Sequence, residues 1–157
     1  MKDSKMKKET PNIIGYLRRA ELTDCDMIFE WANDSEVRKQ SFSTDKIEYL
    51  NHVKWFQSKI EDDHHDFFIY MIGNSCVGQV RVDRKENVGK ISFSISKEFR
   101  NLGYGRQMLV LLEKEYELGF CLEGEVKFDN KPSQQCFESL GYQKILKVDC
   151  LIYKKEL

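Results

Sequence analysis

At residues 100–105 the chain reads Arg100-Asn101-Leu102-Gly103-Tyr104-Gly105, between a strand-like run at residues 90–95 and a helix-like run at residues 106–118. The start of a helix leaves several backbone N–H groups without partners, and the helix dipole adds partial positive charge there. The two glycines let the backbone come close to a ligand, because they carry no side chain. With the charge of Arg100, this turn predicts a cradle for a phosphate or pyrophosphate group.

Two other phosphate-binding loops do not fit this stretch. The chain contains no Gly-x4-Gly-Lys-Ser/Thr motif. A dinucleotide-binding fingerprint needs three glycines early in a βαβ unit, and here two glycines come late. What remains is Arg-x-x-Gly-x-Gly between a strand and a long helix, with an ordinary glycine turn as the alternative.

Composition favours one globular domain with a substantial core. The chain has 157 residues, of which 41% are hydrophobic and 32% charged, and its net charge of -1 argues against non-specific binding to nucleic acid. We expect residues 1–11 to form a mobile basic tail and residues 12–157 to form the domain. Five cysteines without a Cys-x-x-Cys pair argue against a disulfide framework or a zinc site and favour the cytoplasm. No apolar run approaches the length of a membrane span.

Apolar spacing and turn residues divide the chain into alternating helices and strands. We expect, in order, strand 13–19, helices 26–32 and 46–60, strands 66–72, 76–84 and 89–96, helix 106–118, strand 123–128, a short helix ending at 140, and strands 143–147 and 150–154. Residues 37–42 are expected to be irregular. Turns between the three middle strands predict an antiparallel meander. The strand at 123–128 must run parallel to that at 89–96, because a helix connects them.

Side chains of the first helices are candidates for the core or for a substrate site. We expect the aromatic residues Trp31, Trp55 and Phe56 to be buried. Three polar residues are candidates for lining a substrate cleft, with plain surface as the alternative: Arg38, Ser41 and His52. The pair His64-His65 is expected in a solvated loop, because adjacent histidines do not converge on one metal ion.

The order of elements, together with two motifs, resembles the GNAT superfamily of N-acetyltransferases. The Arg-x-x-Gly-x-Gly turn is similar to the acyl-CoA loop of that family. Asn130 with Ser133, followed by Cys136-Phe137-Glu138-Ser139-Leu140-Gly141-Tyr142, resembles the family's Asn-x-x-Ala…Tyr-Glu-x-Leu-Gly-Phe segment. The resemblance covers residues 13–154. It implies an α/β (α+β) fold: a single GNAT-type domain with a central mixed sheet of about seven strands, splayed parallel central strands and about four helices.

The same resemblance implies acetyl-CoA as the cosubstrate, with no metal. Pantetheine would lie along the strand at residues 89–96, and its pyrophosphate would rest on the amides of residues 101–106. Asn130 would contact the pantetheine arm, cap its helix, or do both. The implied cofactor-binding residues are Phe93, Ile95, Arg100, Asn101, Leu102, Gly103, Tyr104, Gly105, Arg106, Asn130 and Phe137.

The implied reaction is attack of a free amine on a thioester, for which the amine must lose a proton. Residues 125–130 resemble ribosomal-protein N-terminal alanine acetyltransferases, and this implies Glu125 as the base, with a solvated strand residue as the alternative. The family often has a tyrosine acid where this chain has Phe137, which cannot donate a proton. Thiols titrate near ~8.5, so water or Ser133 would suffice to protonate the leaving thiolate. Cys136 is expected to be buried in its helix.

The acceptor is implied by a looser resemblance. Residues 31–38, with Ser41 and His52, look like acetyltransferases of nonulosonic (pseudaminic-acid-type) sugar pathways, which acetylate the 4-amino group of a UDP-linked dideoxy sugar. Arg38 and Arg81 would then meet the nucleotide phosphates. Two alternatives stay open: a protein or peptide N-terminal amine, and a CoA-binding module without turnover. The expected partner is a small amine, not nucleic acid or a membrane, and a homodimer is allowed.

Overall fold

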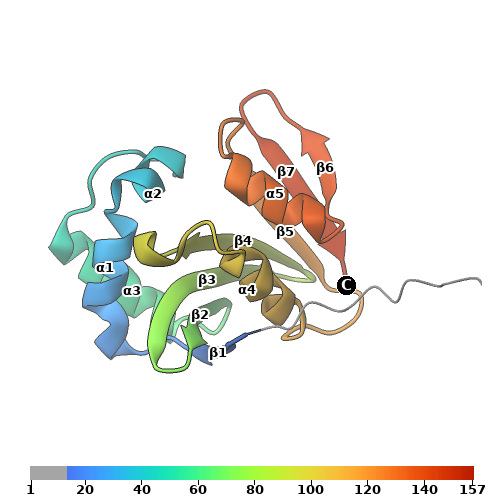
Figure 1. The fold of residues 1–157 in the computed structure, drawn as a ribbon. Helices are drawn as coiled ribbons and strands as arrows, with labels where there is room; N and C mark the ends of the chain where they lie inside the picture. Colours follow the sequence, from blue (N-terminus) through green and yellow to red (C-terminus); the bar gives the residue numbers. More distant parts are fainter. Residues whose placement is uncertain (1–13) are drawn as a thin grey trace, which may run out of the picture.

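The computed structural model describes residues 14–157, which form one twisted sheet with helices on both of its faces. The strands are β1 (Tyr16–Arg19), β2 (His65–Ile72), β3 (Ser75–Lys85), β4 (Val88–Ile95), β5 (Cys121–Val126), β6 (Gln143–Leu146) and β7 (Leu151–Glu156). The α-helices are α1 (Cys25–Ala32), α2 (Ser35–Gln40), α3 (Tyr49–Glu61), α4 (Tyr104–Glu113) and α5 (Lys131–Ser139). The seven strands lie in the order β1-β2-β3-β4-β5-β7-β6 (Figure 1), which confirms the predicted fold class.

The sheet opens in its middle. β2, β3 and β4 form the predicted antiparallel meander, and β4 pairs with β5 in parallel. This parallel pairing joins residues 88–91 to residues 121–124 and then stops, although β4 continues to Ile95. Beyond that point β5, β7 and β6 lean away from the rest of the sheet (Figure 1). Strand edges that diverge keep backbone N–H and C=O groups available to a ligand.

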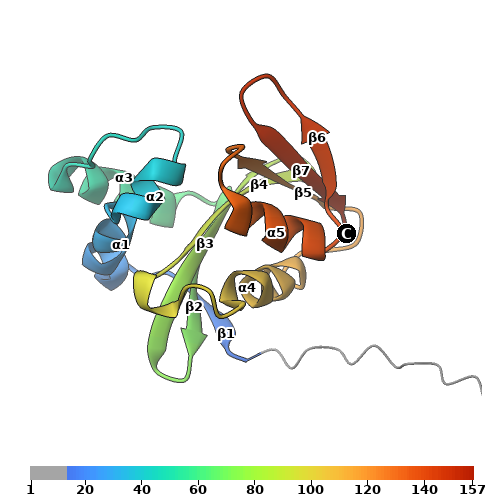
Figure 2. The same cartoon turned by 45° about the horizontal axis from the view of Figure 1, so that its top comes forward.

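Side-chain alternation along the strands feeds two separate cores. On one face, Val80 of β3 and Leu109 of α4 belong to a core cluster, and neither is exposed. On the other face, Ile69 of β2 and Phe56 of α3 belong to a second cluster with similar burial. Figure 2 shows α4 and α5 together against the sheet, apart from α1, α2 and α3. Each fully buried aliphatic side chain contributes about 1.5–3 kcal/mol, so both helical layers stabilise the sheet.

The structure has helix α2 where the sequence predicts an irregular segment, so residues 14–157 hold five α-helices where about four are expected. Asp34 explains the difference, because its side chain accepts hydrogen bonds from the N–H groups of Glu36 and Val37 and caps the helix. The helix is only 6 residues long. Apolar spacing has too few positions in that length to reveal it.

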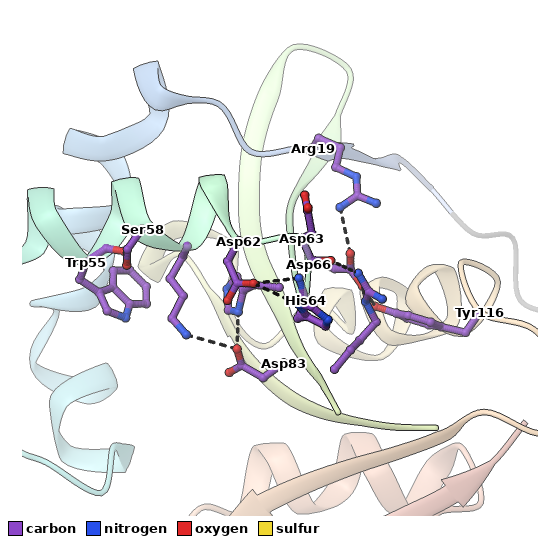
Figure 3. Close-up of polar contacts among 12 residues, drawn as sticks. Arg19, Trp55, Ser58, Asp62, Asp63, His64, Asp66, Asp83 and Tyr116 are labelled. Atoms are coloured by element: carbon purple, nitrogen blue, oxygen red, sulfur yellow. Dashed lines mark hydrogen bonds and ion pairs between the residues drawn. The ribbon is translucent and has the colours of Figure 1, made fainter. Parts of the chain in front are cut away.

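Helix α4 ends at Glu113, five residues before the end that the sequence predicts at residue 118. The chain after it is held by Tyr116, which stacks on Phe120 at 4.6 Å between ring centroids and donates to Asp66 of β2 at 2.7 Å. Asp66 also accepts from Arg19 (both labelled in Figure 3) and from Arg84. Burial opposes ionisation of Asp66, but these donors outweigh it and lower its pKa.

His65 is not in a solvated loop, as the sequence predicts, but begins β2 with its side chain buried. Its Nδ1 lies 2.5 Å from Oδ1 of Asp83 (labelled in Figure 3). Burial lowers the pKa of His65, against the opposing effect of Asp83. The neighbouring His64 is exposed, as predicted.

The predicted basic tail at residues 1–11, and the first residue of the strand predicted from residue 13, lie outside the described residues. Within residues 14–157, no helix combines the length and the apolar character needed to cross a membrane. In the same range, no group of three His, Cys, Asp or Glu side chains is placed to hold a metal ion.

Candidate active site

A cleft of about 1470 Å³ lies where β4 and β5 diverge. Its walls come from α1, α2 and α3 on one side and from α4 and α5 on the other, with β3 and β4 between them. Pockets for a single drug-sized ligand usually measure ~300–1,000 Å³, so this cleft has room for two reactants. Every predicted site residue lines it except Leu102 and Phe137.

The first turn of α4 faces this cleft. Gly103, just before the helix, has a φ of 80°, and Asn101 has a φ of 64°, so the loop turns back sharply into the helix. Tyr104, Gly105 and Arg106 form the first turn and line the cleft. No side chain caps this N-terminus, whereas side chains cap α2 and α5. The arrangement leaves first-turn N–H groups to a ligand, and their partial positive charge suits an anion.

Arg100 is not a free cation at this turn. Its Nη2 lies 2.8 Å from Oδ1 of Asp34, and its Nε donates to the carbonyl of Ile95. Burial opposes ionisation of Asp34, but the Arg100 guanidinium outweighs it and lowers the pKa of that carboxyl. Arg100 therefore ties the glycine turn to the N-terminus of α2 on the opposite wall. Arg106, the other cation of the turn, makes no ion pair with the described residues and lines the cleft.

Cys136 is half-buried and lines the cleft, instead of being enclosed in its helix as the sequence predicts. A Cβ added to Gly105 would lie 3.1 Å from its sulfur, so α4 and α5 approach closely at this point. Burial raises the pKa of the Cys136 thiol, although Arg106 opposes the effect. A thiol with a raised pKa is protonated at neutral pH and a poor nucleophile.

Two predicted cofactor residues lie away from the cleft wall. Leu102 is exposed at the tip of the turn, with 58% of its surface accessible. Phe137 is 1% exposed and belongs to the core, where it stacks on Tyr153 at 5.2 Å. Gly124 of β5 makes room for it, because a Cβ there would lie 2.3 Å from the Phe137 ring. A ring in this place supports the cleft from behind, and its predicted contact with the cofactor stays a prediction.

The predicted catalytic residues come from two elements, β5 and α5, and both line the cleft. Glu125 is exposed on β5 and lines the cleft. Ser133 lies in the first turn of α5, and its N–H donates to Oδ1 of Asn130 at 3.3 Å. The capping role predicted for Asn130 is therefore confirmed. Contact of Asn130 with a cofactor stays a prediction, as do the roles of the other two residues.

The predicted acceptor residues divide by how their polar atoms are used. Arg38 donates to the carbonyls of Ala32 (2.6 Å) and Ser43 (3.1 Å) and to the Ser41 hydroxyl (3.1 Å). Ser41 in turn donates to a carbonyl of α2 at 2.6 Å. These two side chains therefore hold the α2 segment in shape. The side chain of Arg81, in contrast, makes no hydrogen bond or ion pair with residues 14–157.

Aromatic residues and one histidine complete the acceptor side. His52 is 2% exposed, stacks on Phe56, and places Nε2 2.9 Å from the carbonyl oxygen of Cys25. Burial lowers the pKa of His52, so the ring is neutral near pH 7 and donates this hydrogen bond. Phe56 is buried as predicted. Trp31 and Trp55 pack against the second core cluster but are only partly buried, and they also line the cleft.

Sequence reasoning missed several polar residues on the floor of the cleft. Gln79 of β3 and Ser94 of β4 are register partners, and Gln79 Nε2 donates to Ser94 Oγ at 3.1 Å. Ser92 lies beside Arg81 in the same register. The sequence contains a signal for these residues, because they alternate with core residues along both strands. That alternation alone does not distinguish a cleft from a solvated face.

Comparison with known proteins gives a consistent picture of the fold. A family model described as an acetyltransferase (GNAT) domain matches residues 16–143. A domain from Methanocaldococcus jannaschii has a TM-score of 0.79 at 20% identity, covering 90% of this chain and 97% of that one. Spermidine N-acetyltransferase from Vibrio cholerae, in complex with CoA and spermine, has a TM-score of 0.78 at 14% identity, covering 89% and 94%. A ribosomal-protein α-N-acetyltransferase in complex with CoA has a TM-score of 0.77 at 14% identity, covering 90% and 93%. No curated protein matches the sequence.

Proposed function

This chain belongs to the GNAT acetyltransferase family, and from that membership we propose that it transfers the acetyl group of acetyl-CoA to the primary amine of a nucleotide-linked amino sugar. The observation that carries the proposal is the uncapped first turn of α4 at the point where β4 and β5 diverge. A helix N-terminus beside an open strand edge offers N–H groups to a pyrophosphate and backbone pairing to an extended amide arm. Acetyl-CoA has both of these groups, and it supplies the activated acetyl group.

The residues of the turn and of β4 divide the binding of acetyl-CoA between them. The N–H groups of residues 101–106 hold the pyrophosphate, and the free Arg106 side chain adds a positive charge. The β4 edge beyond Ile91 pairs with the pantetheine arm, where Phe93 and Ile95 line the cleft. Arg100 acts indirectly, by fixing the turn to Asp34.

Glu125 is the general base of the proposed reaction. Its carboxylate takes a proton from the acceptor ammonium, directly or through water, and the amine nitrogen then attacks the thioester carbonyl carbon. The C–N bond forms, the C–S bond breaks, and the nitrogen releases its remaining extra proton to water, so that one neutral acetamide and one CoA thiolate result. The thiolate takes a proton from water or from Ser133, because Phe137 has no proton to give and lies in the core.

The part of the cleft that would hold the acceptor favours a small amine that also carries a polar group. The cleft volume of about 1470 Å³ leaves room beside the cosubstrate, and its acceptor wall carries Trp31, Trp55 and the polar floor of β3 and β4. The resemblance of residues 31–38 to amino-sugar acetyltransferases favours a nucleotide sugar. A peptide N-terminal amine is the second candidate, supported by the fold shared with a ribosomal-protein acetyltransferase.

The test is release of free CoA thiol from acetyl-CoA in the presence of each class of amine. We expect kcat/KM to be higher for a UDP-linked 4-amino-dideoxy sugar than for ribosomal-type N-terminal peptides. A higher value for the peptides would overturn the sugar as acceptor and leave acetyl transfer standing. Binding of acetyl-CoA without thiol release for any amine would favour the non-catalytic alternative.

A further inference from the structure

Arg81 occupies an unusual position on the floor of the cleft. Its guanidinium carbon lies 4.9 Å from the ring centroid of Trp55 and 5.8 Å from that of Phe67. Its Nε is buried and has no hydrogen-bond partner among residues 14–157. Burying the Nε donor without a partner costs free energy, and the aromatic faces return only part of it. We expect a guanidinium in this state to bind an anion.

The neighbouring charges do not neutralise Arg81. Asp83 is the nearest carboxylate along β3, but it is engaged by His65 at 2.5 Å and by Lys59 at 3.3 Å. Arg38 adds charge of the same sign. Burial, the larger effect, lowers the pKa of Arg81 to about 10, so the group stays charged at neutral pH. The floor of the cleft therefore keeps a positive charge without a counter-ion.

Two unsatisfied acceptors share this cleft with Arg81. Gln79 lies two residues earlier on the same face of β3, is 9% exposed, and leaves its buried Oε1 without a partner. Gln40 at the end of α2 leaves its Oε1 in the same condition. Both residues line the cleft. Buried polar groups are nearly always hydrogen-bonded, so one donor and two acceptors without partners in one cleft indicate a polar ligand.

The strand register relates Arg81 to Glu125. Arg81 pairs with Ser92 of β4, and Glu125 follows Gly124, the last β5 residue that pairs with β4. Alternation puts the side chains of all three residues on the face opposite the α4 core. Two strand spacings separate the Cα atoms of Arg81 and Glu125, which is on the order of 10 Å before the strands diverge.

We propose that Arg81 binds a phosphate of the acceptor and so determines its specificity, while Gln79 and Gln40 accept hydrogen bonds from N–H or O–H groups of the attached sugar. This inference rests on the proposed acetyl transfer at Glu125 and defines the acceptor by its charge. The amine lies at Glu125 and the phosphate at Arg81, with the sugar ring between them. Arg38 has no part in this contact, because each of its three side-chain nitrogens already donates a hydrogen bond, to Ala32, Ser43 and Ser41.

The kinetic test compares one amino sugar in two forms, as its UDP derivative and as its neutral methyl glycoside. Arg81→Met keeps an apolar chain against Trp55 and removes the charge, and we expect kcat/KM for the UDP derivative to fall roughly 100-fold, mainly through KM. The methyl glycoside should lose less than about threefold. Lys90→Gln is the matched control, because it removes one positive charge from β4 outside the cleft and should change neither value. An equal loss for both forms would mean a packing role only and would overturn the proposal.

A binding measurement separates this inference from the proposed function. With CoA saturating its own site, UDP should bind the unaltered protein and bind Arg81→Met at least about tenfold more weakly by calorimetry. Equal binding to both proteins would overturn the phosphate contact even if the sugar is acetylated. Loss of UDP binding in the variant would support the contact even if another amine proves to be the acceptor.

An amino sugar with a carboxylate in place of the phosphate distinguishes the two oxyanions. A larger effect of Arg81→Met on kcat/KM for the carboxylate than for the phosphate would overturn the phosphate assignment.

Discussion

Among single residues, Glu125 gives the sharpest test of mechanism. Glu125→Gln keeps the shape of the side chain and removes the carboxylate, so we expect kcat to fall roughly 100-fold or more, with the largest loss at low pH, where the amine is protonated. The affinity for acetyl-CoA should hardly change. Glu123→Gln is the matched control, because Glu123 lies on the same face of β5 but outside the cleft, paired with Lys154 at 2.7 Å. An unchanged pH–rate profile for Glu125→Gln would transfer the role to water or another group.

Among the elements, the first turn of α4 should govern cosubstrate affinity. A ligand at 100 times its Kd stabilises the folded state by about 2.7 kcal/mol, so acetyl-CoA should raise the melting temperature clearly. Gly105→Glu should abolish this rise by adding bulk and like charge at the pyrophosphate. Arg106→Gln, a milder change, should reduce it. Lys114→Gln at the other end of the helix should leave the shift intact. A full shift with Gly105→Glu would remove the pyrophosphate from this turn.

The ion pair between Arg100 and Asp34 connects two elements, the glycine turn and α2. Asp34→Asn keeps a good N-cap residue while it removes the charge, and Arg100→Gln removes the partner. A double-mutant cycle on the free energy of unfolding should give a coupling energy of about 0.5–1 kcal/mol, since the pair is largely shielded from solvent. The cycle needs urea unfolding of the parent chain, the two single variants and the double variant. Additive effects would show that the turn and α2 are energetically independent.

For the whole molecule, two buried histidines predict a loss of stability in mild acid. The pKa of His52 and that of His65 are both lowered by burial, so below their unfolded value of ~6.5 the unfolded chain binds more protons than the folded one. The stability that neutral histidine contributes is complete above about pH 6.5 and is lost as the pH falls through the lower folded values. We expect the urea midpoint to fall between about pH 7.5 and pH 5.

Substitution of single histidines tests whether they cause this loss of stability in acid. His65→Gln removes one buried titrating group and should make the urea midpoint less dependent on pH, whatever its effect on stability at pH 7.5. His64→Gln is the matched control, because His64 is the exposed neighbour and the substitution should leave the pH dependence as it was. A midpoint that stays constant from pH 7.5 to pH 5 in the unaltered protein would contradict the account.

Local patterns determined the frame of the molecule. Apolar spacing and glycine turns placed all seven strands, and the helix between β4 and β5 required those two strands to be parallel. The turn at residues 100–105 and many of the residues that line the cleft were also within reach of the sequence, although the polar residues on its floor were not. These features depend on neighbours along the chain or on one chain-crossing rule, which is why a single sequence is enough to predict them.

Tertiary structure alone decided how the predicted site residues are used. Phe137 turned out to support the cleft from the core, because Gly124 on a distant strand leaves space for its ring. Arg100 turned out to be paired, because α2 brings Asp34 to it across the cleft. Arg38 and Arg81 are equivalent as residue types, yet the first is satisfied by nearby carbonyls and the second is left open between two aromatic rings. The sequence specifies which groups are present, but whether a buried charge has a partner depends on contacts that form only when remote segments pack.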